Sequence, residues 1–287
     1  MIHMRLVGGL GNQLFQYACG RAVALRHGTE LVLDTRELSR GAAHAVFGLD
    51  HFAIRARMGA SADLPPPRSR VLAYGLWRAG FMAPRFLRER GLGVNPAVLA
   101  AGDGTYLHGY FQSEAYFRDV VPQIRPELEI VTPPSDDNLR WASRIAGDDR
   151  AVSLHVRRGD YVASAKGQQV HGTCDADYYA RAVAAIRARA GIDPRLYVFS
   201  DDPHWARDNL ALDAETVVLD HNPPGAAVED MRLMGVCRHH IIANSSFSWW
   251  GAWRNPSAGK VVVAPVRWFA DPKLHNPDIC PPEWLRV

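Results

Sequence analysis

The second half of the chain alternates short apolar runs with longer helical stretches, and this alternation constrains the fold more than any other feature. The apolar runs predict strands at 151–157, 195–199, 216–219, 240–243 and 260–264. Between them, apolar residues at helical spacing predict helices at 177–190, 203–210, 228–236 and 248–254. Such alternation indicates a parallel sheet covered by helices, with ligands bound at the carboxyl ends of the strands.

The first residues predict a second unit of the same α/β kind. Ile2–Val7 has the pattern of a strand, helical spacing follows as far as Gly28, and Glu30–Leu33 forms the next strand. The turn between strand and helix is Gly8-Gly-Leu-Gly-Asn-Gln13. Free N–H groups at a helix N-terminus favour anionic or polar ligand groups. Asn12 suits either an N-cap or a ligand contact, and the two roles are compatible.

The glycine-rich turn resembles a dinucleotide-binding fingerprint but departs from it at one position. Gly9 and Gly11 supply the first two glycines, whereas Leu14 stands where close packing of helix on strand requires the third. Asp34, after the second strand, is the kind of acidic residue that such a site uses for ribose. An NAD(P)-dependent Rossmann oxidoreductase therefore remains an alternative.

Prolines at 122, 126, 133 and 134 interrupt regular structure near the middle of the chain. Asp136 or Asp137 then has the character of a helix start. The length of 287 residues suits two medium-sized domains. We therefore predict one domain at 1–135 and a second at 136–287.

His155-Val-Arg-Arg-Gly-Asp-Tyr161 follows the first strand of the second half, so its polar side chains fall at a strand end. If the strand continues through Arg158, alternation puts His155 and Arg157 on one face and Arg158 on the other. The glycine lets the backbone turn. The guanidiniums, the imidazole and the Asp160 carboxylate suit a phosphorylated ligand, because arginine offers phosphate oxygens a planar fork of donors. The alternative is a pair of solvated surface arginines.

Two more polar clusters follow strands of the same predicted sheet. Phe199-Ser-Asp-Asp202 offers carboxylates that accept from base or ribose groups, and Asn244-Ser-Ser-Phe-Ser-Trp-Trp250 offers hydroxyls at a helix N-terminus. Each cluster alone also fits helix capping, which we favour for Asp202 ahead of Pro203. The convergence of three clusters on one sheet edge is what predicts a binding site.

Charge and cysteine spacing give little support to several other functions. The net charge of 33 − 30 = +3 is too small to argue for nucleic acid, although it does not oppose an anionic ligand. Cysteines at 19, 174, 237 and 280 show no paired spacing and suggest a reducing compartment. Neither these cysteines nor the neighbouring histidines have the spacing of a zinc site. We find no signal peptide and no apolar run of membrane-spanning length.

Five motifs together resemble the α-1,2-fucosyltransferases of glycosyltransferase family 11. They are the three clusters above, the turn Gly8-Gly-Leu-Gly-Asn-Gln13, and Gly109-Tyr-Phe-Gln-Ser-Glu114. The resemblance implies an α/β, GT-B-type fold of two Rossmann-like domains with a cleft between them, the first on the acceptor side and the second binding GDP-fucose. It also implies inverting transfer of L-fucose to the 2-hydroxyl of a terminal galactoside, with no metal or other cofactor.

The resemblance further implies roles for single residues. Arg157 would hold the β-phosphate and stabilise the charge on departing GDP. Asn12 would approach the leaving oxygen or the acceptor, and Asp160 is the candidate base for the acceptor hydroxyl. The residues expected to bind substrates are His155, Arg158, Gln13, Asp201, Asp202, Asn244, Ser245, Ser246 and Phe247.

Asp175-Ala-Asp177 fits the D-x-D pattern with which other glycosyltransferases bind a metal, but its place at a predicted helix start favours capping. Animal members of the family carry an N-terminal anchor, and this chain enters a strand almost at Met1. We therefore expect a cytoplasmic, bacterial-type enzyme whose partners are GDP-fucose and a glycan acceptor. Nucleic acid and a membrane span are not expected, and peripheral membrane contact is left open. A catalytically silent protein that binds nucleotide-sugars or glycans is the remaining alternative.

Overall fold

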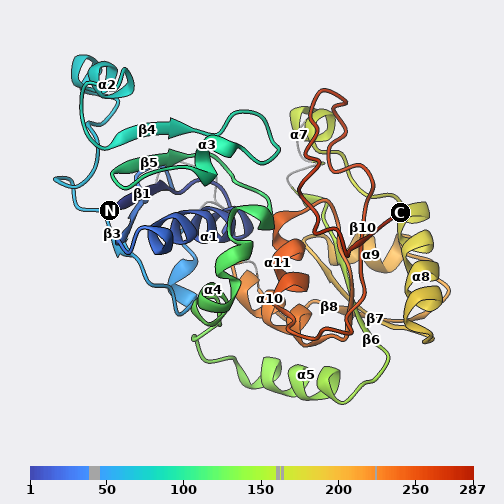
Figure 1. Ribbon diagram of the computed structural model, residues 1–287. Helices are drawn as coiled ribbons and strands as arrows, with labels where there is room; N and C mark the ends of the chain where they lie inside the picture. Colours follow the sequence, from blue (N-terminus) through green and yellow to red (C-terminus); the bar gives the residue numbers. More distant parts are fainter. Residues whose placement is uncertain (39–45, 160–161, 163–164, 224) are drawn as a thin grey trace. The chain divides into compact units, whose positions relative to one another are not determined.

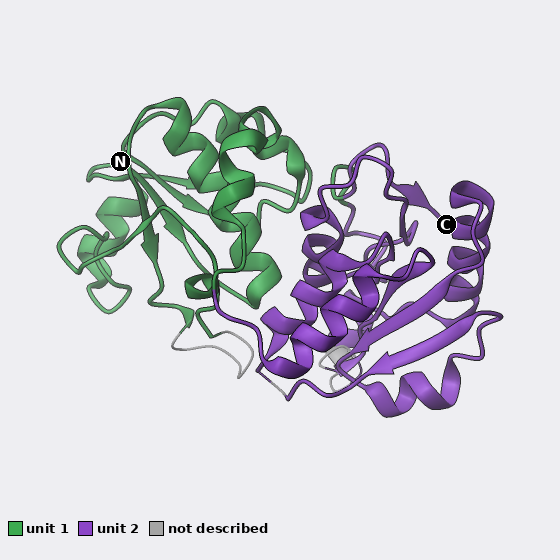
Figure 2. Ribbon diagram, turned by 90° about the horizontal axis from the view of Figure 1, so that it is seen from below, with its two compact units in different colours: residues 1–131, 276–279 green, residues 132–275, 280–287 purple. Residues whose placement is uncertain are grey.

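The computed structural model describes residues 1–38, 46–159, 162, 165–223 and 225–287. It divides into two compact units, Met1–Val131 with Asn276–Ile279, and Thr132–His275 with Cys280–Val287 (Figure 2). The division falls four residues before the predicted boundary. In addition, a short late segment belongs to the first unit, because the Asn276 amide donates to the Gln112 carbonyl at 3.0 Å.

The first unit is built on a five-stranded sheet with the order β3-β2-β1-β5-β4, in which every pairing is parallel. Its helices and strands are β1 (Ile2–Arg5), α1 (Leu10–Arg26), β2 (Leu31–Asp34), β3 (Arg57–Met58), α2 (Val71–Arg78), β4 (Arg85–Arg88), α3 (Pro96–Leu99), β5 (Thr105–His108) and α4 (Val121–Glu127) (Figure 1). The predicted strand, helix and strand at the start of the chain are therefore confirmed. Helix α1 begins earlier than the first residue of its apolar stripe, and its N-cap is Gly9. The prediction that Asn12 is the N-cap was therefore wrong.

The two faces of this first sheet differ in chemistry. Ile2 and Met4 are fully buried and apolar, and α1 packs against β1. Alternate positions carry polar groups, and His3 and Arg5 are almost completely buried on the opposite face. The rings of Tyr106 in β5 and Trp77 in α2 pack edge to face, with their centroids 5.0 Å apart. One layer of this unit is thus a plain apolar core, and the other mixes rings with buried charge.

The second unit is built on a six-stranded parallel sheet with the order β11-β10-β9-β6-β7-β8. Its elements are α5 (Asp136–Ala146), β6 (Ala151–Val156), α7 (Ala165–Val170), α8 (Ala176–Ala190), β7 (Arg195–Ser200), α9 (Pro203–Asn209), β8 (Glu215–Leu219), α10 (Ala227–Val236), β9 (His239–Ile241), α11 (Ser246–Arg254), β10 (Val262–Ala264) and β11 (Leu285–Arg286). All the strands and helices predicted between 151 and 264 are present. Helix α5 begins at Asp136, as expected.

Helices cover both faces of the second sheet. Side chains of α8 and α9 form one core with alternate residues of β6, which include Val152 and Leu154. Side chains of α5 and α10 form the other core with Ala151 of β6 and with β7 and β8. Gly191, which was expected to end the helix before it, closes α8 with a φ of 68°. Parallel β6 is therefore buried on both faces, as its continuous apolar run indicates.

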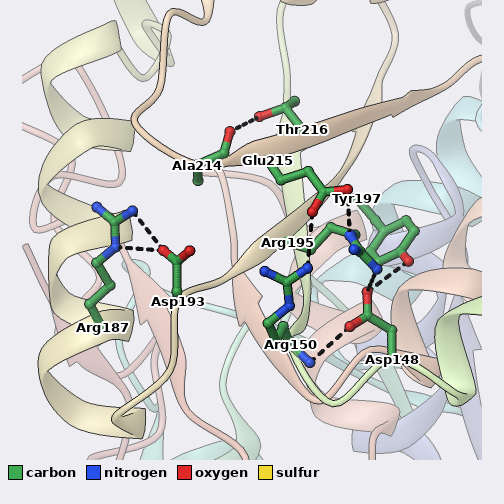
Figure 3. Close-up of polar contacts among 9 residues, drawn as sticks. All are labelled: Asp148, Arg150, Arg187, Asp193, Arg195, Tyr197, Ala214, Glu215 and Thr216. Atoms are coloured by element: carbon green, nitrogen blue, oxygen red, sulfur yellow. Dashed lines mark hydrogen bonds and ion pairs between the residues drawn. The ribbon is translucent and has the colours of Figure 1, made fainter.

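Ion pairs tie together the amino ends of β7 and β8 (Figure 3). The Arg195 guanidinium lies 2.8 Å from Asp148 and 2.8 Å from Glu215, and Tyr197 donates to Asp148 at 2.9 Å. Burial opposes ionisation of Asp148. The Arg150 amide, the Tyr197 hydroxyl and Arg195 nevertheless hold its pKa below the usual range. These contacts lie at the amino edge of the sheet, opposite the edge that carries the predicted polar clusters.

None of the helices within the described residues is both long enough and apolar enough to cross a membrane.

Candidate active site

The predicted site lies at the carboxyl edge of the second sheet, where the strand order reverses. β6 is flanked by β7, which follows it in the chain, and by β9, which is reached only later. Loops leaving such neighbours run in opposite directions, and doubly wound sheets bind ligands at such a point. The segment after β6 carries the two arginines, and the segment after β9 leads into α11.

Arg157 is held by a carboxylate from the next strand. Its Nη1 lies 2.8 Å from Oδ2 of Asp201, and each side chain is about a quarter exposed, at 26% and 25%. The other oxygen, Oδ1, accepts from the Arg158 backbone N–H at 2.8 Å. A Cβ on Gly159 would lie 2.7 Å from Oδ2. Gly159 has no left-handed φ, and its lack of a Cβ permits the close approach of Asp201.

Arg158 takes a different direction from Arg157. β6 ends at Val156, before either arginine, so strand alternation does not govern them. The Arg158 guanidinium lies over the Trp205 ring at 3.9 Å, with its Nε 3.6 Å from Asp202. Asp202 accepts from the Trp205 backbone N–H at 3.1 Å and caps α9, as predicted.

His155 is a buried neutral imidazole beside the arginines. Burial lowers its pKa to about 4; the Asp201 charge opposes this shift and the Arg157 charge adds to it. Its Nδ1 has no hydrogen-bond partner among the described residues. The ring faces Phe247 of α11, with centroids 5.6 Å apart. Tyr179 fixes the strand end by donating to the His155 carbonyl at 3.0 Å. The neutral imidazole therefore has one ring nitrogen that can form a hydrogen bond with a ligand.

The residues after β9 shape the N-terminus of α11. Ser245 is the N-cap and accepts from the Phe247 N–H at 3.3 Å, and Ser246 is the first helical residue. Asn244 is buried and donates to the carbonyls of His171 and Trp268 at 2.9 and 3.2 Å. Asn244 therefore anchors loops in this structure, while the two serines stand at a helix end suited to phosphate.

The sequence singled out two acidic residues for chemical roles, Asp160 as a base and Asp175 as part of a D-x-D motif. Asp160, the candidate base, lies outside the described residues. Asp175 caps α8 by accepting from the Tyr178 N–H at 2.7 Å, which confirms the capping interpretation of the D-x-D motif. Among the residues that the structure describes, no three His, Cys, Asp or Glu side chains gather as a metal would require.

Asn12 and Gln13 belong to the corresponding edge of the first sheet, where β1 lies between β2 and β5. Gln112, which follows β5, donates to Oδ1 of Asn12 at 2.7 Å. Gln13 is fully buried, and its amide bonds the backbone of Gly8, Val46 and Gly48. The structure thus uses Gln13 to shape the turn, and it places Asn12 at the edge itself.

Three residues at the carboxyl edges of the two sheets were not predicted from the sequence. Glu89 accepts from the backbone N–H groups of Tyr110 and Phe111 at 2.7 and 3.0 Å and holds Phe111 at a φ of 52°, which is unusual for a residue other than glycine. Gln16 joins the loop after β1 to the loop after β5. The ring of Trp205 stacks against the Arg158 guanidinium. A signal existed only for Trp205, which follows the predicted Asp202 cap in the first turn of its helix.

Comparison with known proteins adds a family to this geometry. The whole chain, residues 1–287, matches the profile described as Glycosyl transferase family 11. The chain belongs to glycosyl transferase family 11. This glycosyltransferase is 32% identical to an α-1,2-colitosyltransferase of Escherichia coli, over 99% of this chain and 97% of the relative. It is 30% identical to the O-antigen biosynthesis glycosyltransferase WbnK of Escherichia coli, over 92% and 94%.

More distant similarities follow. A galactoside 2-alpha-L-fucosyltransferase of Caenorhabditis elegans is 28% identical, over 62% of this glycosyltransferase and 51% of the relative. The solved structure of the fucosyltransferase NodZ from Bradyrhizobium aligns with a TM-score of 0.49 at 14% identity, over 87% of this chain and 91% of that one. The full-length family match confirms the resemblance found in the motifs and removes the oxidoreductase alternative.

Proposed function

We propose that this glycosyltransferase moves L-fucose from GDP-fucose to the 2-hydroxyl of a terminal galactoside, with inversion at the anomeric carbon and without a metal. The observation that supports this most directly is the Arg157 guanidinium, which Asp201 holds at 2.8 Å beside the point where the strand order reverses. A fixed arginine at that position suits the diphosphate of a nucleotide-sugar.

The chemistry follows from where charge develops. As the bond from the fucose anomeric carbon to the β-phosphate oxygen breaks, negative charge grows on GDP. Arg157 stabilises that charge, and the N-terminus of α11 at Ser245 and Ser246 adds partial positive charge. His155 is neutral, so it adds no charge to the site, and its imidazole contributes a hydrogen bond. Asp160 as the base and Asn12 near the acceptor complete the proposal as predictions from the motifs.

A second donor deserves a direct comparison because the E. coli relative that is 32% identical is named a colitosyltransferase. Colitose differs from fucose by lacking the 3-hydroxyl. A site that binds this hydroxyl with buried polar groups discriminates strongly against the deoxy sugar, whereas an apolar site discriminates weakly. Turnover of GDP-fucose and GDP-colitose, measured side by side, therefore distinguishes the two donors.

The test of the proposal begins with calorimetry of GDP-fucose and GDP in the presence of a chelator. We expect binding that does not depend on added metal, and turnover on a β-galactoside with an α-1,2 product linkage by NMR. Arg157→Ala should abolish turnover, while Arg140→Ala, at an exposed position on α5, should leave it intact. A strict requirement for Mg²⁺ or Mn²⁺ would refute the metal-free account. Binding without turnover on any acceptor would favour the silent alternative.

The proposal includes a cytoplasmic place of action. All four cysteines are free thiols, at 19, 174, 237 and 280, which fits a reducing compartment. Fractionation of cells that express the chain, with a periplasmic marker as control, tests this part separately from activity.

A further inference from the structure

Helix α2 turns an apolar face outward. Trp77 is 2% exposed and packs on Phe86 with ring centroids 5.1 Å apart, so it marks the inner face. Positions 71, 72, 75, 76 and 79 fall on the opposite face at 100° per residue. Those positions are Val, Leu, Gly, Leu and Ala. Val71 is 77% exposed and Leu72 is 79% exposed. A helix whose outer face only meets water carries polar residues there, so the apolar outer face of α2 is unusual.

The turn after α2 extends the same surface. Phe81 is 78% exposed, and Met82 is also exposed. Val71, Leu72, Leu76, Phe81 and Met82, which we call the α2 patch, are five of the thirteen large apolar side chains that are exposed among the described residues. They lie within twelve consecutive positions. Figure 1 shows α2 at the outer edge of the first unit, beyond β4. Such a concentration of exposed apolar groups indicates an interaction surface.

The stretch of chain that carries the α2 patch has charged residues of a single sign. Residues 64–88 contain five arginines and no aspartate or glutamate, in a chain whose basic and acidic residues number 33 and 30. All five arginines, at 68, 70, 78, 85 and 88, are exposed. The arginines at 68, 78 and 88 all lower the pKa of His108, after burial and Arg5, so their charges reach a common point. Exposed positive charge therefore accompanies the exposed apolar side chains along residues 64–88.

We infer that the α2 patch docks on an anionic lipid bilayer, with its apolar side chains in the headgroup region and the exposed arginines of residues 64–88 on lipid phosphates. Charge complementarity decides the occupant, because a stretch with exposed Phe, Leu and Val, five exposed arginines and no carboxylate from 64 to 88 has the features of an interfacial membrane anchor. A protein interface is favoured less, since its rim normally mixes both charges and neutral polar groups. This inference does not depend on the proposed reaction.

The test is flotation of the full chain with vesicles of phosphatidylcholine alone and of phosphatidylcholine mixed with phosphatidylglycerol. We expect flotation only with the anionic vesicles at low salt, and loss of it at high salt because exposed charges are screened. Leu72→Ser with Phe81→Ser should lower partitioning by at least about 10-fold, and so should Arg70→Glu with Arg85→Glu. The matched control, Leu139→Ser with Val266→Ser, removes exposed apolar side chains elsewhere and should float like the original chain.

These variants separate docking from folding and from catalysis. Because the altered side chains are largely exposed, thermal unfolding should not change, and neither should turnover on a water-soluble acceptor. Equal flotation with neutral vesicles, no flotation at low salt, or unchanged flotation of both patch variants would overturn the inference. It would also be overturned if the chain did not float and the patch variants converted a dimer into a monomer in light scattering, which would assign the surface to a protein partner.

Discussion

Gly159→Ala tests how Arg157 is positioned. The new Cβ would lie 2.7 Å from Oδ2 of Asp201, so this oxygen must move by at least 3.0 − 2.7 = 0.3 Å, and by 3.4 − 2.7 = 0.7 Å to reach ordinary contact. The same oxygen holds Nη1 of Arg157 at 2.8 Å. A shift of this size in a group that orients a reacting charge costs about 10- to 100-fold in turnover. Stability should fall by no more than about 1 kcal/mol, since the Asp201 carboxylate is partly exposed and free to yield.

The assay is kcat and KM for GDP-fucose together with thermal unfolding. Gly147→Ala is the control, because its new Cβ would meet nothing closer than 3.5 Å and the site lies elsewhere. We expect kcat to fall more than affinity in the Gly159 variant, and neither to change in the control.

A double-mutant cycle decides whether Asp201 transmits the effect. If it does, Gly159→Ala should add almost nothing to the loss already caused by Asp201→Ala. Fully additive losses would show that the methyl group acts through other contacts, and unchanged turnover in the single variant would refute the positioning argument altogether.

Other predictions follow from the same contacts. Arg157→Lys keeps the charge but loses the planar fork of donors, so turnover should fall by at least about 100-fold. Arg158→Lys should lower turnover less. If kinetics showed the larger loss in the Arg158 variant, the roles of the two arginines would be exchanged. Asp175→Ala should cost about 1 kcal/mol in chemical unfolding and leave activity unchanged, since it removes a cap; lost activity at full stability would reinstate the metal motif. Burial lowers the pKa values of His108 and His155 to about 4. The unfolded chain therefore binds more protons, and the unfolding free energy should decline as pH falls below about 6.5, by up to about 1.4 kcal/mol per pH unit for each histidine. A flat urea midpoint between pH 7 and 5 would contradict this.

The sequence allowed prediction of the second unit because each strand is a short apolar run and each helix has a local start or stop. Gly191 and the Asp202 cap are examples in which one residue sets an element boundary. Helix α11 begins two residues before its prediction because Ser245, rather than a later serine, is the cap. Local chemistry of this kind is readable without the fold.

The rest of the candidate site depends on contacts between distant segments, which no local pattern records. Glu89 supports the loop after β5, and Trp205 lies under Arg158, only because the strands pair in a particular order. Gln13 stands in a substrate-binding motif by sequence, yet its amide is used by the surrounding backbone. The reason for Gly159 also emerged only when Asp201 was placed beside it.

The late arrival of β9 beside β6 has a consequence for synthesis of the chain. Leu154 pairs with Ile241, so the two sides of the site are separated by β7, β8 and their helices in the order of translation. A nascent chain that ends before α11 carries Arg157 but lacks the helix N-terminus beside it. Long-range parallel pairing of this kind forms slowly and leaves sheet edges open in the meantime. With GDP-fucose as the proposed donor, nucleotide binding should appear only when the whole second sheet has closed, so that the donor would report complete folding and stabilise only the finished protein.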